Sequence, residues 1–392
     1  MIRELIRREA KRVYPEVVRL RREIHMRPEL GMETFGTADL VVSALRKAGV
    51  QVEKAAGGAG AVALVKGAKP GRCVGLRADM DALPIEEEND VPYRSKVRGV
   101  MHACGHDAHT AMLVGVGIVL NSLREHLSGA VKLIFQPGEE VGKGALAMIE
   151  DGVMDDPKVE MIFAQHVWTE LELGRIGVRK GACMANMDEV RIEIEGVGGH
   201  GAYPHLTRDP IVAAAYLITQ LQTVVSRTVS PLESAVVSIC RVQGGTTFNV
   251  IPSKVELQGT LRSLDEEVRE RVIERIKAIL RGIEAGMEVR CRFECRRGSP
   301  VVYNDPELTE LVREVGEEVL GEGSVEEVEP TMGGEDFAFY LQHAPGTFYR
   351  LGIKAEGFED KKIHSPNFDL PEEAMRIGVE VMANLAFRAT SA

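Results

Sequence analysis

The chain has 392 residues, of which 44% are hydrophobic and 27% are charged. This is an ordinary globular composition, but the chain is too long for one hydrophobic core, so we expect two domains. The formal net charge of −11 argues against a nucleic acid or an anionic membrane as the main partner.

The sequence shows no targeting or membrane-spanning segment. Met1 to Ile24 is rich in arginine and glutamate and lacks the apolar core and cleavage site of a signal peptide. The longest apolar run, Ala111 to Leu120, has about half the length that a membrane-spanning helix needs. The six cysteines are scattered without the spacing of a disulfide framework. These features predict a cytoplasmic protein.

The first part of the chain alternates between helical and strand-like stretches. Helical periodicity predicts helices over Pro15–Met26, Thr34–Ala48, Thr110–Leu123 and Gly144–Glu150, the third of them apolar nearly all round. Short apolar stretches predict strands over Ala61–Lys66, Cys73–Arg77, Val131–Phe135 and Met161–Ala164. This alternation indicates an α/β fold with a mainly parallel central sheet flanked by helices.

A different pattern begins after Gly181. Strands and amphipathic helices follow one another in the order β-α-β-β-α-β, which is typical of a ferredoxin-like α+β unit. Their expected bounds are Glu189–Glu195, Pro210–Val225, Ala235–Val242, Val255–Leu261, Leu264–Ile283 and Glu288–Glu294.

The earlier alternation resumes beyond Gly298, with a helix over Pro306–Leu320 and a strand over Thr347–Leu351. The simplest architecture is therefore a discontinuous large domain with a compact insert. We place the large domain at residues 1–184 and 297–392 and the inserted domain at residues 185–296.

Side chains that can bind metals follow several of the predicted strands. Functional residues in open α/β sheets collect at the carboxyl ends of the strands. Acids follow two of the strands here and an imidazole follows a third, while a loop before the buried helix and a segment near the end of the chain add more. The residues are Asp79, Asp81, Cys104, His106, Asp107, Glu139, Glu140, His166 and His364.

These residue types predict a binuclear metal site. Thiolate, imidazole and carboxylate are ligands of zinc and similar divalent ions. Two neighbouring ions need one bridging ligand, about two terminal ligands each and one group that activates water. Glu139 is the group left to activate water. Each residue taken singly is better explained by a structural role, and it is their coincidence at the strand ends that indicates a metal site. The ligands would be Cys104, His106, Glu140, His166 and His364.

Two other interpretations stay open at this point. A thiol peptidase would use Cys104 with one base and an orienting group, which leaves Glu139 and Glu140 unexplained. A metal-binding protein without catalytic activity would explain the ligands but not the intact Glu139.

Longer stretches of the sequence resemble the zinc aminoacylase and carboxypeptidase family of metallopeptidases. The resemblance is to the branch of hippurate hydrolases, indole-acetyl-amino-acid hydrolases and archaeal aminoacylase/carboxypeptidases. It runs collinearly from about Arg22 to Leu385, which is nearly the whole chain. The motifs that carry it are Leu76–Pro84, Met101–His109, Phe135–Glu140, His166–Trp168, Gly198–His205, Gly244–Pro252, Gly259–Ser263, Met332–Phe337 and His364–Pro366.

The resemblance implies two divalent ions per subunit. Zinc would be the native metal, although manganese, cobalt and nickel suit such sites as well. Cys104 would bridge the two ions, His106 and His166 would complete one site, and Glu140 and His364 would complete the other.

The resemblance also assigns the residues around the ions. Glu139 would be the general base, which deprotonates the metal-held water and then protonates the leaving amine. Asp81 and Asp107 would orient imidazoles. The chain departs from the family at Gly138, where relatives usually have alanine, and we expect this to change the shape of the local pocket.

The inserted domain would act as a lid and a dimerisation domain. His200 would polarise the scissile carbonyl, serving the partner's site in a homodimer or higher homo-oligomer. Arg262, with Asn249 expected nearby, would bind the free carboxylate of the substrate. Gly333 and Gly334 would let the backbone approach the substrate closely.

The sequence therefore predicts a metal-dependent amidohydrolase that cleaves N-acyl amino acids, as an aminoacylase, or short peptides, as a carboxypeptidase. Specificity for hippurate or N-acetyl-diaminopimelate stays open, because motifs do not give the volume of a pocket. The expected partner is a small molecule and neither a nucleic acid nor a membrane.

Overall fold

The structure, a computed structural model, describes residues 2–391 and divides into two compact units. The first unit comprises the chain up to Gly181, then Tyr303–Glu329, then the chain from Asp336 onward. The second unit comprises Ala182–Val302 and Pro330–Glu335.

The segment 330–335 belongs to the second unit, although the sequence placed it in the large domain. The backbone N–H of Thr331 donates to the carbonyl of Cys183 at 3.0 Å, and that of Ala185 donates to Gly333 at 3.0 Å. These hydrogen bonds join segments far apart in the chain, which sequence periodicity does not reveal. Gly333 and Gly334 are consequently part of the second unit.

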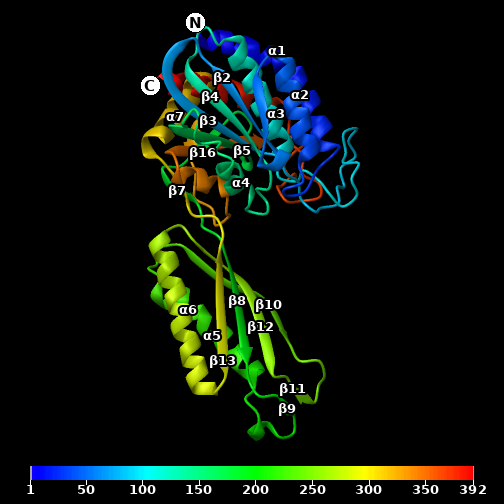
Figure 1. Ribbon diagram of the computed structural model, residues 1–392, viewed down its shortest axis with the longest axis vertical. Helices are drawn as coiled ribbons and strands as arrows, with labels where there is room; N and C mark the ends of the chain where they lie inside the picture. The colour runs from blue at the N-terminus through cyan, green and yellow to red at the C-terminus, as the bar shows by residue number, and fades with distance from the viewer. Residues whose placement is uncertain (1, 392) are drawn as a thin grey trace. The chain divides into compact units, whose positions relative to one another are not determined.

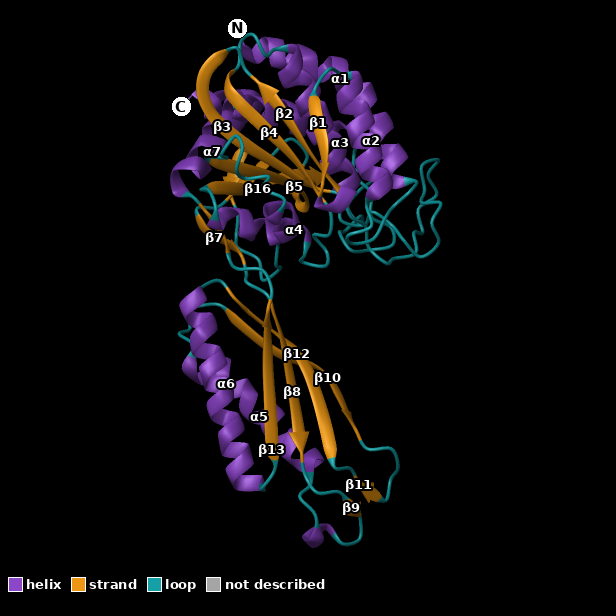
Figure 2. Ribbon diagram, viewed as in Figure 1, coloured by secondary structure: helices purple, strands orange, loops and turns teal. Residues whose placement is uncertain are grey.

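A mixed sheet of eight strands in the described chain forms the centre of the first unit (Figures 1 and 2). Its order is β1-β2-β4-β3-β5-β16-β6-β15. The pairs from β4 to β16 are parallel, as is β6 with β15, whereas β1 with β2, β2 with β4 and β16 with β6 are antiparallel. The predicted α/β fold with a mainly parallel central sheet is confirmed. The strands are β1 (Gln51–Ala55), β2 (Gly60–Lys66), β3 (Lys69–Asp79), β4 (Ser128–Gln136), β5 (Met161–Glu172), β6 (Ile176–Val178), β15 (Val325–Glu327) and β16 (Gly346–Lys354).

Helices α3 and α8 pack against the central strands, and α1 packs across both of them. The predicted all-round apolar helix is α3, and it is buried along most of its length. A side chain at Gly115 of α3 would lie 2.6 Å from Val17 on α1 and 3.0 Å from Val379 on α8, so the three helices pack closely there. The helices of this unit are α1 (Ile2–His25), α2 (Phe35–Lys47), α3 (His106–Ser122), α4 (Gly144–Glu150), α7 (Pro306–Leu320) and α8 (Glu373–Ser391).

The second unit has an antiparallel sheet of order β10-β12-β8-β13 with two helices. Alternate residues of β8, namely Val190, Ile192 and Ile194, are buried in one core with side chains of both helices. The order of elements is the predicted β-α-β-β-α-β. The elements are β8 (Asp188–Glu195), α5 (Pro210–Thr228), β10 (Ala235–Gly244), β12 (Lys254–Ser263), α6 (Glu266–Met287) and β13 (Arg290–Arg297).

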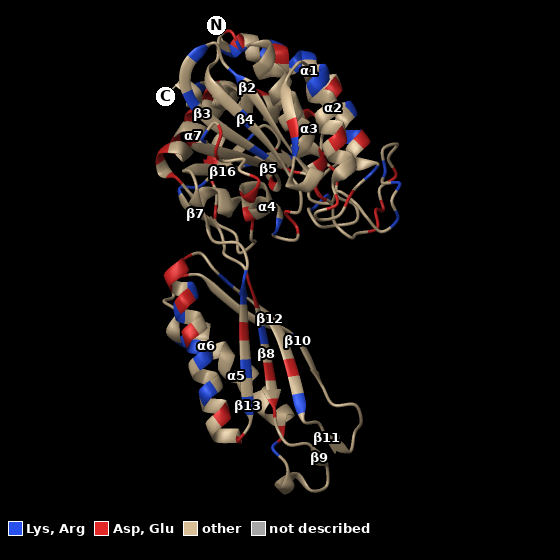
Figure 3. Cartoon of the chain, in the orientation of Figure 1, with Lys and Arg blue, Asp and Glu red and all other residues tan. Residues whose placement is uncertain are grey.

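The β8 residues between those buried positions are partly exposed and charged. Glu193 on β8 pairs with Lys254 on β12 at 2.9 Å and with Arg292 on β13 at 3.2 Å. Acidic and basic residues are interspersed along these strands and along α6 (Figure 3). The alternation of charged and apolar residues thus gives the small sheet one solvated face and one core face.

Short elements complete the fold. They are β7 (Gly181–Met184), β9 (Gly199–His200), β11 (Val250–Ile251), β14 (Val302–Asn304) and the 3₁₀ turns η1 (Ala56–Gly58), η2 (Pro204–Leu206) and η3 (Asp336–Gln342). Among residues 2–391, none of the helices combines the length and the apolar composition that a bilayer crossing requires.

Candidate metal centre and active site

Two of the predicted ligands lie at the start of α3 in the first unit. His106 is the first residue of this helix, which begins four residues before the predicted start at Thr110, and Cys104 precedes it by two residues. Gly105 between them has a φ of 85°, a left-handed conformation that glycine adopts without strain. A side chain at Gly105 would also lie 2.6 Å from Val167. The glycine therefore allows the loop to turn sharply and lie against β5.

His166 lies within β5 and not in a loop after it, so the predicted end of this strand at Ala164 is wrong. The strand continues to Glu172 because β16 pairs along it, with Arg350 opposite His166 and Leu351 opposite Val167. The partner strand comes from the far end of the sequence, and therefore the local pattern did not show the extension. Nε2 of His166 lies 3.5 Å from Sγ of Cys104.

Asp81, in the loop after β3, fixes the paired glutamates that follow β4. Its carboxylate accepts hydrogen bonds from the backbone N–H groups of Glu139 at 3.0 Å and Glu140 at 3.1 Å. Its backbone carbonyl accepts a hydrogen bond from Nδ1 of His106 at 2.9 Å. Asp81 therefore orients the glutamate turn with its carboxylate and the His106 ring with its backbone.

The five predicted ligands form one continuous cluster. Ligand atoms of Cys104, His106 and Glu140 all lie within 4.8 Å of one another. Oε1 of Glu140 is 4.0 Å from Nε2 of His106 and 3.4 Å from Nε2 of His364. The Cys104 contact with His166 adds the fifth residue.

The chemistry of this cluster fits a divalent cation. Two of its buried atoms, Nε2 of His106 and Oε1 of Glu140, have no hydrogen-bond partner among the described residues, and such atoms are rare because they are costly. The other ring nitrogens are occupied, since Nδ1 of His106 donates to Asp81 and Nδ1 of His166 donates to the Val167 carbonyl at 2.7 Å. Both rings therefore present Nε2 lone pairs to the cluster, as metal ligation requires.

Burial and local charge set the protonation of these groups. Burial raises the pKa of the Cys104 thiol to about 12. Burial also lowers the pKa of His166 well below its ordinary value, which keeps that ring neutral. Burial alone would lower the pKa of His106, but the Asp79 carboxylate and the Cys104 sulfur raise it well above its usual range. The negative charge of these two groups thus favours a cation at Nε2 of His106, which is either a proton or a metal ion that takes its place.

The high pKa of Cys104 bears on the thiol-peptidase interpretation. A nucleophilic cysteine needs a thiol pKa that is lowered by its surroundings. The shift at Cys104 has the opposite direction. The surroundings of Cys104 therefore do not supply the activated thiolate that a thiol peptidase needs.

Asp79, one of the acids that follow the predicted strands, and His109 also lie beside these ligands, although neither was among the five predicted ligands. Oδ1 of Asp79 accepts a hydrogen bond from Nδ1 of His109 at 2.6 Å and lies 3.8 Å from Nε2 of His106. Nε2 of His109 accepts a hydrogen bond from the backbone of Val167 at 3.0 Å. The signal in the sequence was the three-residue spacing of His106 and His109, which places both on one face of a helix.

Asp107 contacts an imidazole that is not among the five ligands. Its Oδ2 accepts hydrogen bonds from Nδ1 of His25 at 2.7 Å and from Nε of Arg21 at 2.7 Å. Burial alone would raise the pKa of Asp107, but the charges of Arg21 and His25 hold it well below its ordinary value. Asp107 is therefore an ionised anchor between α1 and α3.

The sequence model of the family described as Peptidase family M20/M25/M40 matches residues 75–388 of this chain. This range begins in β3 and ends in α8. The chain belongs to this family.

Curated and structural relatives agree with the family match. N-acetyl-L-cysteine deacetylase of Bacillus subtilis is 40% identical over 360 residues, which is 92% of this chain and 85% of that protein. Thermostable carboxypeptidase 2 of Saccharolobus solfataricus is 39% identical over 394 residues, which is 98% of each. A crystal structure of a dinuclear metal-binding M20 peptidase from B. subtilis superposes with a TM-score of 0.86 at 35% identity, over 97% of this chain and 99% of that one.

These relatives confirm the resemblance that the motifs indicated. The protein is a metal-dependent amidohydrolase of the M20 family, with the fold of a dinuclear metal-binding peptidase.

Gly138, where this M20 peptidase departs from its family, has a structural reason to be glycine. Its φ is 62°, in the left-handed region. A side chain there would lie 2.4 Å from Sδ of Met32 and 3.4 Å from Val141. Met32 thus fills the space that an alanine methyl group would need beside Glu139.

The residues expected to recognise the substrate lie in the second unit, at two separate places. His200 pairs with Val250 across β9 and β11, and the backbone of Gly201 donates to the carbonyl of Asn249 at 2.8 Å. Arg262 is near the end of β12, where its Nη1 donates to the Met332 carbonyl at 2.9 Å.

The expectation that Asn249 lies near Arg262 is wrong for a single chain. Asn249 lies beside the β9–β11 pair, close in sequence to Lys254 at the start of β12. An extended strand from Lys254 to Arg262 spans about 26 Å. Gly333 and Gly334 are in the same unit as Arg262, and a side chain at Gly334 would lie 3.1 Å from Met187.

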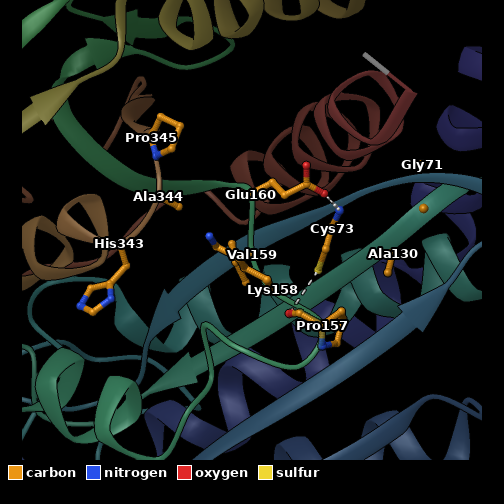
Figure 4. Close-up of a pocket in the computed structure, with 11 residues that line it drawn as sticks. Gly71, Cys73, Ala130, Pro157, Lys158, Val159, Glu160, His343, Ala344 and Pro345 are labelled. Carbon is orange, nitrogen blue, oxygen red and sulfur yellow. Dashed lines mark hydrogen bonds between the residues drawn. The ribbon is translucent and has the colours of Figure 1, made fainter.

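A separate pocket of about 700 Å³ opens beside the amino-terminal ends of β3, β4, β5 and β16 (Figure 4). Cys73 lines it, with its thiol 3.8 Å from the Pro157 carbonyl, and burial raises the pKa of this thiol to about 11. None of the five predicted ligands lines the pocket. It is at the opposite ends of these strands from the loops of Asp81 and Glu139 and is not part of the metal centre.

Proposed function

We propose that this protein hydrolyses the amide bond of N-acyl amino acids, and of short peptides with a free carboxylate, at a centre of two divalent ions. The observation that carries the proposal is a pair of buried atoms, Nε2 of His106 and Oε1 of Glu140, which lie 4.0 Å apart beside Cys104 and have no hydrogen-bond partner among the described residues. Two relatives support the substrate class, because one is named for deacetylating an N-acetyl amino acid and the other is a carboxypeptidase.

Five side chains of the first unit would hold the ions. Cys104 would bridge them, with His106 and His166 completing one site and Glu140 and His364 completing the other. The contacts support this division, since Cys104 touches His166 and Glu140 touches His364. Thiolate and imidazole favour zinc, while the carboxylate suits manganese, cobalt or nickel as well. Divalent ions in such a centre supply Lewis acidity to a carbonyl and acidify water.

Glu139 would act as the general base. Its backbone N–H is fixed by the Asp81 carboxylate at 3.0 Å, next to the ligand Glu140, whose backbone Asp81 also holds. A carboxylate in this place can accept a proton from the attacking water and return it to the leaving amine. The rigid turn would keep the base beside the ions through both steps.

His200 would polarise the scissile carbonyl within a homodimer, each subunit serving the other's site. Support comes from the second unit, which exposes several large apolar side chains, among them Tyr203, Leu206, Tyr216 and Phe248. Its edge strand β10 pairs on one side with β12 and is free to pair on the other. Exposed apolar groups and a free strand edge suit association with a second copy.

Arg262 and Asn249 would recognise the substrate carboxylate, with Gly333 and Gly334 lining its approach. A guanidinium forms two parallel hydrogen bonds to a carboxylate. Because Asn249 lies far along the sheet from Arg262, the two would reach one carboxylate from different subunits, with Asn249 accompanying its neighbour His200.

The six free cysteines support the predicted cytoplasmic location.

A substrate panel tests the proposal. The zinc-loaded protein is assayed on N-acetyl and longer N-acyl amino acids, hippurate, N-acetyl-diaminopimelate and dipeptides, each compared with its C-terminal amide. We expect hydrolysis of free acids, with the amides cleaved far more slowly. Equal rates on acids and amides would contradict carboxylate recognition, and no hydrolysis of any member by protein with full metal content would contradict the proposed substrate class.

A further inference from the structure

A fully buried arginine joins two segments, far apart in the sequence, that each carry a candidate metal ligand. Arg21 lies on α1, and its side chain has no exposed surface. Its Nε donates to Oδ2 of Asp107 at 2.7 Å, and its Nη2 donates to Oδ1 of Asp369 at 2.8 Å. Asp107 directly follows the candidate ligand His106, and Asp369 is five residues after the candidate ligand His364.

The segment 363–369, which we call the His364 loop, is held at its other end by the backbone. The N–H of His364 donates to the carbonyl of Ala103, next to Cys104, at 2.7 Å. His364 has a φ of 60°, in the left-handed region that non-glycine residues rarely occupy. Such a conformation persists where the surroundings impose it. The position of the His364 ring therefore depends on contacts that fix the loop.

Further contacts support the Arg21 end of the loop. The hydroxyl of Tyr93 donates to Oδ2 of Asp369 at 2.9 Å, and the Arg21 guanidinium lies 4.8 Å from the centre of the Tyr93 ring. The side chain of Asn89 donates to the carbonyl of Phe368 at 2.8 Å. Both oxygens of Asp369 are thus occupied, one by Arg21 and one by Tyr93.

Net stability does not explain this arrangement well. Attraction between buried charges is offset by the cost of removing them from water, so a buried ion pair contributes little net stabilisation. The planar guanidinium can, however, hold two carboxylates at fixed angles, which a lysine cannot. The bridge between Asp107 and Asp369 therefore serves geometry more than stability.

We propose that Arg21 is a positioning residue that sets the place of His364 relative to Cys104 and His106, and thereby supports the ion at Glu140 and His364 selectively. The inference rests on the ligand set given under Proposed function. Without Arg21 the His364 loop would lose its only charged partner among these contacts, while the hydrogen bonds from Tyr93 and Asn89 and the one to Ala103 would remain. His106 and His166 would keep their hydrogen bonds, because they are fixed by Asp81 and by the β5 backbone.

Zinc binding to Arg21→Met tests the proposal. Equilibrium dialysis at defined free zinc, followed by elemental analysis, gives the number of ions and the affinity of each. We expect two ions in the native protein. The variant should keep one at native affinity and bind the second about 10–100-fold more weakly, the usual cost of losing an outer hydrogen-bond partner of a metal site.

Arg269→Met is the matched control. Arg269 is a buried arginine on α6 of the second unit, where Nε donates to Asp188 at 2.8 Å and Nη1 donates to Glu266 at 2.8 Å. The substitution removes a buried guanidinium that bridges one buried and one exposed carboxylate and touches no candidate ligand. This variant should bind two zinc ions at native affinity, whatever its loss of thermal stability.

Asp369→Asn keeps the test decisive if Arg21→Met does not fold. The amide has nearly the shape of the carboxylate but weakens the bond to Arg21. The affinity for the second zinc ion alone should therefore fall, by a smaller factor than in Arg21→Met. Native zinc affinity at both sites of the folded variants would overturn the proposal. An equal fall in affinity at both sites would overturn it too, as would the same fall in affinity at one site of Arg269→Met. A native protein that binds fewer than two ions would instead contradict the proposed metal centre.

Discussion

The two units hold their candidate functional residues in different ways. In the first unit the ligands His106 and His166 are buried, and each has its second ring nitrogen fixed by a backbone carbonyl. In the second unit His200 is exposed, and its ring accepts a hydrogen bond from the neighbouring backbone of Ala202 at 3.1 Å. Asn249 is exposed as well.

This difference separates two kinds of task. Metal and proton chemistry needs groups held in place before the substrate arrives, since reorganisation during the reaction raises the barrier. Groups that recognise a substrate or act in a partner's site need an accessible surface instead. We therefore expect first-unit substitutions to change metal binding or turnover, and second-unit substitutions to change recognition without loss of metal.

Glu139→Gln should give the largest effect on turnover. An amide cannot accept the proton of water, so kcat should fall by about 10²–10⁴-fold, while metal content stays native because Glu139 is not a proposed ligand. Steady-state kinetics and elemental analysis check both parts. Glu150→Gln, at an exposed position on α4, is the control. A Glu139→Gln variant with a tenth of native kcat would show that another group transfers the proton.

His200→Ala should lower kcat by about 10²–10³-fold, the usual cost of one lost oxyanion donor, again with native metal content. Mixing it with Glu139→Gln subunits should restore activity, because a mixed dimer would contain one site with both residues intact. Activity of the exchanged mixture, together with the mass of the particle in solution, provides the check. A monomer, or a mixture as inactive as its components, would contradict the shared site.

Arg262→Ala should lower kcat/KM by about 10²-fold, which corresponds to the 2–3 kcal/mol of a charge-assisted hydrogen bond. The loss should be confined to substrates with a free carboxylate. Arg275→Ala is the control, because Arg275 is an exposed arginine of α6 in the same unit. Measurements on an N-acyl amino acid and on its amide decide the point, since an equal loss on both would mean that Arg262 does not bind the carboxylate.

Much of this organisation was predictable from the sequence, because it depends on local patterns. The period of the apolar residues gave the order of elements in the second unit. The end of β4 gave the candidate ligand Glu140, and the loop before α3 gave the candidate ligands Cys104 and His106. Helix α8 was not predicted, although most of it is buried. Strand β1 was not predicted either, because only two of its five residues are buried.

The remaining features depend on contacts between distant segments. The extension of β5 through His166 follows from pairing with β16, which comes about 180 residues later. The separation of Asn249 from Arg262 follows from the full length of β12, and the bridge from Arg21 joins residues of α1, α3 and the His364 loop. No periodicity within one segment carries such information.

Gly138→Ala should have the smallest effect on activity of these substitutions. Strain at a positive φ should destabilise the fold by about 1 kcal/mol, and the contact with Met32 should add to this and shift the turn that carries Glu139. Gly142→Ala is a matched control, since Gly142 also has a φ of 62° but has open space around it. Thermal unfolding and kcat of both variants separate the two causes. Equal losses of thermal stability and of kcat in both variants would show that the contact with Met32 affects neither quantity.

The most direct test of the account is the dependence of activity on metal content. Dialysis against a chelator should abolish hydrolysis of an N-acyl amino acid, and stepwise addition of zinc should restore it as the content rises to two ions per subunit. Cys104→Ser and His364→Ala should each bind less metal and recover less activity. The account predicts that activity follows bound metal throughout; full activity in a metal-free sample would contradict it.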